Sequence, residues 1–256
     1  MTETIARPGV EEPGAPGTAA RIVDGVKVYG SEATLVRALD GVSADFSNGE
    51  FSAVMGPSGS GKSTLLHCLA GLDRLTEGQV LIDDIDLGQL KDKAMTLLRR
   101  ERVGFVFQSF NLVPTLDARE NIVLPLTLAG RKPDRDWFDS LVSTLGIGDR
   151  LGHRPSELSG GQQQRVAMGR ALVTHPALVF ADEPTGNLDS RSATDLLEQM
   201  RATVDTLGQT VVMVTHDAHG ASYADRVLFL ADGKIVRELP APSTDTILET
   251  VRELGD

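Results

Sequence analysis

Residues 51–69 read FSAVMGPSGSGKSTLLHCL, and this stretch sets the expected class of fold. The apolar run Phe51–Met55 predicts a buried strand, and Lys62–Leu69 predicts a helix. Between them, Gly56–Ser63 matches the pattern G-x-x-x-x-G-K-[ST]. A strand before this loop and a helix after it are the context that supports a phosphate-binding loop. The alternative, a Gly- and Ser-rich turn with a chance lysine, leaves that context unexplained.

The loop also predicts which groups hold phosphate. Backbone N–H groups of residues 59–63 would wrap a β-phosphate, Lys62 would bridge the β- and γ-phosphates, and the Ser63 hydroxyl would bind Mg²⁺. GTPases share such a loop but need a base-reading Asn-Lys-x-Asp, which this sequence lacks, whereas small-molecule kinases are excluded only by the rest of the chain. The residues expected to bind nucleotide are Gly56, Pro57, Ser58, Gly59, Ser60, Gly61, Lys62, Ser63 and Thr64.

The remaining pattern indicates an α/β protein. In the last third, apolar strands at 178–181 and 210–215 are separated by a helix at 190–207 with one apolar stripe. Continuous apolar strands that alternate with helices indicate a mostly parallel sheet covered on both faces. The fold expected is therefore a P-loop NTPase core with an antiparallel β sub-domain and an inserted helical sub-domain at about 109–165.

Two local signals concern the connections. Asn48-Gly49, just before the strand that leads to the loop, is a hairpin turn signal, and so is Asp232-Gly233 between the strand-like runs 227–231 and 235–239. Within 116–150 two helical patterns are expected, with breaks at Pro125 and at 130–133.

The domain boundaries follow from composition. Residues 1–20, MTETIARPGVEEPGAPGTAA, are rich in Pro, Gly, Ala and Glu and are expected to form a disordered tail. Residues 21–242 would form the ATPase domain, and residues 243–256 a C-terminal helix. The tail has no apolar core typical of a signal peptide, and no apolar stretch of the chain reaches the ~20 residues of a membrane span.

Charge and cysteine content exclude other classes. The 256 residues carry a formal net charge of -11, which argues against nucleic-acid binding because such binding needs a basic face. Cys68 is the one cysteine, so an internal disulfide cannot form.

A second group of polar side chains follows predicted strands. The apolar run 178–181 ends in Asp182 and Glu183, and such strand ends are where parallel sheets bind ligands. Asp182 would hold Mg²⁺ through water, while Glu183, on the other side of the strand, could polarise an attacking water. His216 follows another strand and could reach a γ-phosphate, and Gln108 ends a third strand, where its amide could be a metal ligand.

A separate stretch, Leu158-Ser159-Gly160-Gly161-Gln162, is suited to anion contact but contains no general base or strong nucleophile. It precedes a run, Gln163–Leu172, that predicts a helix, so its backbone N–H groups would lie at a helix N-terminus. Two anion-binding segments for one nucleotide suggest a site assembled from two copies of the chain.

Together these motifs resemble the nucleotide-binding subunit of an ABC transporter, from about Ile22 to Leu239, in family order. The resemblance implies that Tyr29 stacks on adenine, that Gln108 touches Mg²⁺ and faces the membrane partner, and that Glu183 is the catalytic base. It also implies that Asp189 crosses a dimer interface and that His216 senses the γ-phosphate. Residues expected to contact ATP held by the other subunit are Ser159, Gly160, Gly161 and Gln162. The residues expected to take part in catalysis are Lys62, Gln108, Glu183, Asp189 and His216, and those expected at Mg²⁺ are Ser63, Gln108 and Asp182.

Three stretches, 71–74, 108–116 and 184–189, are similar to the macrolide-exporter and lipoprotein-releasing group. That group implies ATP and Mg²⁺ as ligands, a second copy of the chain as partner, and a permease with few membrane helices and a large extracytoplasmic domain. The chain would then lie at the cytoplasmic face of the membrane, held there by the permease, and would drive export, lipoprotein release or mechanical transmission. Two alternatives remain open. One is the ATPase of a solute importer; such ATPases often carry an extra C-terminal domain, and the segment of only about fifteen residues after the last strand argues against that form. The other is a non-transport ABC ATPase.

Overall fold

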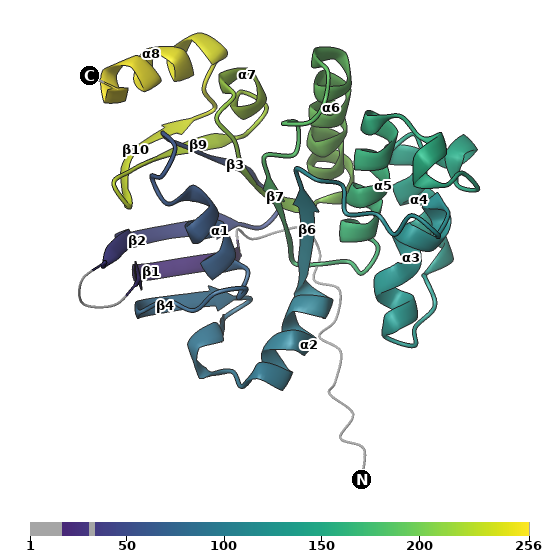
Figure 1. Ribbon diagram of the computed structural model, residues 1–256, viewed down its shortest axis with the longest axis horizontal. Coiled ribbons are helices and arrows are strands. Elements are labelled where there is room, and N and C mark those ends of the chain that lie inside the picture. Colours follow the sequence, from purple (N-terminus) through teal and green to yellow (C-terminus); the bar gives the residue numbers. More distant parts are fainter. Residues whose placement is uncertain (1–16, 31–33, 256) are drawn as a thin grey trace.

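The computed structural model describes residues 17–30 and 34–255 and builds them around two sheets (Figure 1). The smaller sheet has the strand order β2-β1-β4-β5, and its pairs are antiparallel. Its strands are β1 Thr18–Tyr29, β2 Val36–Ser47, β4 Glu77–Ile82 and β5 Ile85–Asp86. The predicted boundary of the N-terminal tail at residue 20 is wrong, because β1 begins at Thr18 and its residues Ala19 and Ala20 are buried. Residues 1–16 of the predicted tail lie outside the described residues.

The larger sheet has the order β10-β9-β3-β8-β7-β6, and every pair except β10–β9 is parallel. Asp232 and Gly233 both have positive φ in the turn between β9 and β10, as the Asp-Gly hairpin signal requires. The mostly parallel sheet predicted from the sequence is therefore confirmed. Its strands are β3 Phe51–Met55, β6 Val103–Phe107, β7 Leu178–Asp182, β8 Thr210–Val214, β9 Arg226–Ala231 and β10 Lys234–Pro240.

Helix α1, Lys62–Leu69, lies between the two sheets (Figure 1). Its Leu65 and Leu66 share a core with Val54 and Val212, while the adjacent strand residues Ala53 and Met213 face a second core on the other side of the larger sheet. This alternation, with the strands buried on both faces, fixes the direction in which each strand end presents its side chains.

The second core is covered by helices. The helical sub-domain lies to one side of the larger sheet, and its last helix extends to Leu172, beyond the predicted limit at 165 (Figure 1). No helix among the described residues is long and apolar enough to span a membrane. The other helices are α2 Asp92–Arg102, α3 Ala118–Leu128, α4 Arg135–Thr144, α5 Gly160–Leu172, α6 Ser190–Leu207, α7 Ala218–Ala221 and α8 Thr244–Gly255, with 3-10 turns at Leu87–Gln89, Gly148–Arg150 and Pro155–Glu157.

Two predictions about connections are wrong. Asn48 and Gly49 join β2 to β3, which belong to different sheets, so they do not form a hairpin. Pro125 lies inside α3 instead of breaking it. Asp117 and Glu120 form a reciprocal cap at the start of this helix, and Ile122 and Leu126, on either side of Pro125, are both buried in the core.

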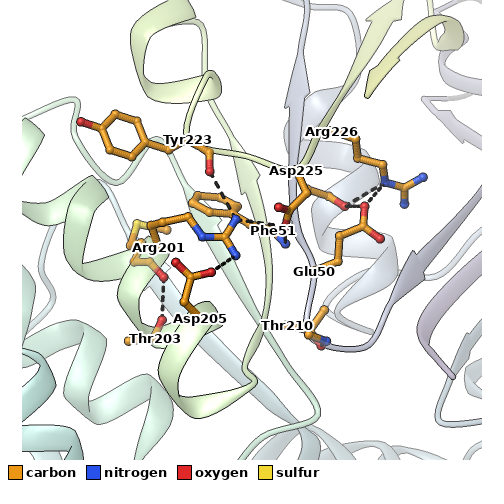
Figure 2. Close-up of polar contacts among 12 residues, drawn as sticks. Glu50, Phe51, Arg201, Thr203, Asp205, Thr210, Tyr223, Asp225 and Arg226 are labelled. Atoms are coloured by element: carbon orange, nitrogen blue, oxygen red, sulfur yellow. Dashed lines mark hydrogen bonds and ion pairs between the residues drawn. The ribbon is translucent and has the colours of Figure 1, made fainter. Parts of the chain in front are cut away.

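A polar network ties α6 to the strand ends remote from the phosphate loop (Figure 2). The guanidinium of Arg201 pairs with Asp225 at 3.0 Å and with Asp205 at 2.7 Å. Asp225 also accepts a 2.8 Å hydrogen bond from the backbone N–H of Phe51, the first residue of β3. Beside it, Arg226 pairs with Glu50 at 2.7 Å. These contacts fix where β3 and β9 begin.

Candidate functional site

The phosphate loop follows β3 with a backbone that only glycine accommodates at two points. Gly56 has φ 153°, and a Cβ there would lie 2.0 Å from the carbonyl oxygen of Leu230. Gly61 has φ 103°, and its Cβ would lie 2.2 Å from the carbonyl oxygen of Ala38. The loop is thus confined between two other segments, and a bulkier residue at either position would displace it.

Lys62, the first residue of α1, bends back over this loop. Its Nζ donates to the carbonyl oxygens of Gly56 at 2.8 Å and Pro57 at 2.9 Å. Burial lowers the pKa of Lys62, and the negative charges of Glu183 and Asp182 act against that shift. A partly buried cation at the start of a helix suits an anionic ligand.

One cavity brings together the predicted side chains from three strand ends. It is lined by Lys62 from the loop after β3, Glu183 after β7 and His216 after β8. Val251 and Leu254 of α8 form part of its wall. Its other lining residues are Met55, Gly56, Pro57, Ser58, Phe229, Leu230 and Ala231.

Glu183 and His216 are in direct contact. The Nδ1 atom of His216 lies 2.9 Å from Oε1 of Glu183, and the Glu183 side chain is 22% exposed against 75% for His216. Glu183 has φ 47°, a conformation that is uncommon outside glycine, and its backbone N–H donates to the carbonyl oxygen of Val214 at 2.9 Å. This turn directs Glu183 away from Asp182, whose side chain faces α1, so the two acids face different partners as the sequence predicts.

Asp182 and Ser63 lie together and are the residues that would hold Mg²⁺. The Ser63 hydroxyl lies 3.5 Å from Oδ1 of Asp182, and burial raises the pKa of that carboxyl, while the hydrogen bond from Ser63 acts against the shift. The described residues contain no group of three His, Cys, Asp or Glu side chains that could hold a metal by themselves. Mg²⁺ commonly takes one or two protein oxygens and completes its shell with water and phosphate, and this pair fits that habit.

Gln108 and Asp189 are engaged elsewhere. Gln108 Nε2 donates to Oδ1 of Asn187 at 3.3 Å, and Asn187 Nδ2 donates to the carbonyl oxygen of Gln108 at 3.0 Å. In the described part of the chain no hydrogen bond joins Gln108 to Ser63 or Asp182. Asp189 caps α6 by accepting from the Ser192 hydroxyl at 2.7 Å and its backbone N–H at 3.0 Å, which lowers the pKa of that carboxyl.

The stretch Ser159–Gln162 lies at the start of α5, which begins at Gly160 and not at Gln163. Ser159 is the cap: its hydroxyl accepts from the Gln162 N–H at 3.3 Å, and Gln162 Oε1 accepts from the Ser159 N–H at 2.9 Å. Among the described residues that line the Lys62 cavity, none comes from this stretch. The structure therefore separates the two predicted anion-binding segments.

Tyr29, the predicted adenine contact, lies at the end of β1 with 40% of its surface exposed. Its hydroxyl donates to Asp73 at 2.7 Å, and Lys27, which binds the same carboxylate at 2.6 Å, lies 4.7 Å from the ring centre. Burial and the hydrogen bond to Asp73 raise the pKa of Tyr29, while a hydrogen bond with Thr64 lowers it. In the sequence, Asp73 was noted only as part of the stretch 71–74 that is similar to the macrolide-exporter group, and no role was predicted for Lys27 or Asn187.

Comparison with known proteins decides the family. A family model described as ABC transporter matches residues 39–186. The chain belongs to the ABC transporter family.

As an ABC ATP-binding protein it has relatives in export systems. It is 42% identical over 215 residues to the bacitracin export ATP-binding protein BceA of Halalkalibacterium halodurans, covering 83% of this chain and 85% of that one. It is 46% identical over 217 residues to the macrolide export ATP-binding/permease protein MacB of Hyphomonas neptunium, covering 84% of this chain and 34% of MacB. The predicted resemblance to the macrolide-exporter group is confirmed.

A solved structure confirms the predicted fold. The ABC cassette MJ0796, a protein of Methanocaldococcus jannaschii, superposes on this ABC chain with a TM-score of 0.77 at 39% identity, over 88% of this chain and 99% of the other. That cassette has been solved as a dimer, including a post-hydrolysis dimer bound to ADP and Pi.

Proposed function

We propose that this ABC protein hydrolyses ATP and drives a membrane complex of the export or mechanical-transmission type. One observation carries the proposal: Lys62, Glu183 and His216 line a single cavity next to a glycine-rich loop. A cation, a carboxylate and an imidazole around a phosphate-binding loop can stabilise phosphate charge and orient a water for phosphoryl transfer.

In this proposal each side chain has a defined role. Lys62 neutralises charge on the β- and γ-phosphates. Glu183 orients the attacking water, and the 2.9 Å contact with His216 holds the Glu183 side chain in place. His216 also contacts the γ-phosphate. Ser63 and Asp182, with Gln108, are the residues that would hold Mg²⁺, which when bound neutralises further phosphate charge. Tyr29 supports the adenine ring from β1.

The active unit proposed is a head-to-tail dimer. Ser159–Gln162 offers a helix start for anion contact but does not line the Lys62 cavity of its own chain, so its ligand would be the ATP of a second copy. Asp189 would lie at the interface between the copies. The dimeric structures of the related cassette support this arrangement.

The membrane partner would contact the segment from Gln108 to Asn121. A groove beside this segment is lined by Phe105, Phe107, Asn111, Pro125 and Arg170, among others. Arg170 holds the segment by donating to the carbonyl oxygen of Asn111 at 2.6 Å. We propose a permease with few membrane helices and a large extracytoplasmic domain, as in the relatives' group, with this chain at the cytoplasmic face and no nucleic-acid partner.

The test uses Glu183→Gln. The variant keeps the phosphate loop and the size of the side chain but loses the carboxylate, so it should bind ATP, lose turnover and accumulate as an ATP-bound dimer in size-exclusion chromatography. Lys62→Ala is the matched control that should fail to bind ATP and stay monomeric. Full turnover by Glu183→Gln would refute the assignment of Glu183.

A further inference from the structure

Gln164 is a fully buried polar residue in α5, one turn after Gly160. Its Nε2 atom donates two hydrogen bonds, to the carbonyl oxygen of Phe107 at 3.0 Å and to that of Pro184 at 2.8 Å. Only the NH₂ end of an amide carries two donors, so two carbonyl acceptors fix the orientation of the side chain. Its Oε1 has no hydrogen-bond partner within the described residues, and the two donors therefore make all of its polar contacts there.

Both carbonyl groups belong to neighbours of proposed catalytic residues. Phe107 directly precedes Gln108, and Pro184 directly follows Glu183. The two loops also meet each other, because a Cβ at Gly186 would lie 2.7 Å from Nε2 of Gln108. One buried amide therefore joins three segments: the helix that begins with the Ser159 cap, the end of β6 and the turn after β7.

We infer that Gln164 is a positioning residue that holds Gln108 and Glu183 in register with the start of α5. The inference rests on the proposed function. In a head-to-tail dimer the start of α5 serves the partner's ATP, whereas Glu183 serves the ATP of its own chain. The Gln164 amide thus lies on the short connection between the two nucleotide sites, and it acts through Phe107 and Pro184 without touching substrate.

The chain contains a matched control for this residue. Gln209 is 6% exposed, and its Nε2 donates to the carbonyl oxygens of Pro176 and Thr210, each at 3.2 Å. These acceptors lie before β7 and at the start of β8, at the ends of the strands remote from Glu183 and His216. Losing the amide of Gln209 removes the same kind of contact without touching either catalytic loop.

The experiment compares Gln164→Met with Gln209→Met in the full chain. Both changes keep an unbranched side chain of similar volume and remove the two donors. We measure kcat and KM for ATP hydrolysis, ATP affinity of the monomer, and the thermal unfolding midpoint. Both variants are expected to lower the midpoint, but Gln164→Met alone should lower kcat, by about 10- to 100-fold as expected for a misplaced catalytic group, with monomer ATP affinity within about twofold of wild type.

Gln164→Asn provides the second variant, since it keeps an amide whose stem is too short to reach both carbonyl groups. It should also lower kcat even if Gln164→Met does not fold. A kcat within threefold of wild type in the folded Gln164 variants, or an equal loss of kcat in Gln209→Met, would overturn the inference. ATP-dependent dimerisation of Glu183→Gln is measured in parallel. If that dimer does not form, the proposed function is refuted. If it forms normally while the Gln164 variants keep the wild-type kcat, only the role of Gln164 is refuted.

Discussion

Asp225→Ala is predicted to destabilise the fold without altering catalysis. The Asp225 carboxylate accepts from the backbone N–H of Phe51 at 2.8 Å and pairs with Arg201 at 3.0 Å (Figure 2). Phe51 is fully buried, and its N–H would lose its protein acceptor in the variant. A hydrogen bond to a charged group contributes about 1.5–3 kcal/mol. A partly exposed ion pair adds about 0.2–1 kcal/mol.

The sum must be reduced because the Asp225 side chain is 47% exposed and Arg201 keeps its second partner, Asp205. We therefore expect a loss of about 2 kcal/mol in the free energy of unfolding. For a chain of this size that loss lowers the unfolding midpoint by about 4–8 °C. The measurement is urea unfolding followed by circular dichroism, together with a thermal scan.

Asp205→Ala is the control, since it removes the other carboxylate from the same arginine. Asp205 is 57% exposed and lies one helical turn from Arg201, so its loss should cost only about 0.3–0.5 kcal/mol. Both variants should keep the wild-type kcat, because the network lies at the opposite ends of the strands from Glu183 and His216. Equal stability losses for the two variants would show that the Phe51 hydrogen bond is not what Asp225 contributes.

Three further outcomes are expected. Ser159→Arg should leave ATP binding by the monomer intact and block ATP-dependent dimerisation, because the stretch does not line its own chain's cavity; weakened monomer affinity in a nucleotide titration would contradict this. Asp73→Ala should raise the Kd for ATP about fivefold, which corresponds to about 1 kcal/mol, because Tyr29 loses the acceptor that holds its hydroxyl at 2.7 Å. The kcat at saturating ATP should not change. An unchanged Kd would show that Tyr29 does not contact the adenine. Burial raises the pKa of Cys68 to about 12 from 9.0, so the native thiol stays protonated while the unfolded thiol ionises, and stability should fall as pH rises from 9.0 towards 12. Cys68→Ala should remove that part of the alkaline destabilisation, and identical pH profiles for the two proteins would argue against it.

Features carried by a short stretch of sequence were predictable. The strand, loop and helix around Gly56–Ser63 and the two acids at the end of β7 appear at the expected positions, because each depends on neighbours along the chain. The hairpin signal at Asp232-Gly233 led to a hairpin, whereas the equally local signal at Asn48-Gly49 did not. The difference is tertiary: β2 finds its partner in β1, while β3 is drawn into the other sheet between β8 and β9.

Contacts between a side chain and a distant backbone atom were not predictable. Gln164 reads as one of three consecutive glutamines on a helix, and nothing local distinguishes it from Gln163, whose amide donates to Leu158. Its acceptors lie 57 and 20 residues away in the sequence. Backbone acceptors leave no complementary side chain by which a sequence pattern could reveal the pair. Asp73 and Asn187 do bond to side chains, those of Tyr29 in β1 and of Gln108 after β6, but these partners are 44 and 79 residues away in the sequence.

The capped start of α5 bears on how the proposed dimer could close. The Ser159 hydroxyl is already an acceptor for the Gln162 N–H, yet a hydroxyl keeps one donor when it accepts. It could therefore donate to a phosphate without giving up the cap. The N–H groups of Gly160 and Gly161 lie in the first turn, where a helix supplies them with no internal acceptor. An anion from a second chain could thus be bound by a helix start that is already formed, so that most of the ordering cost falls on bringing the two chains together.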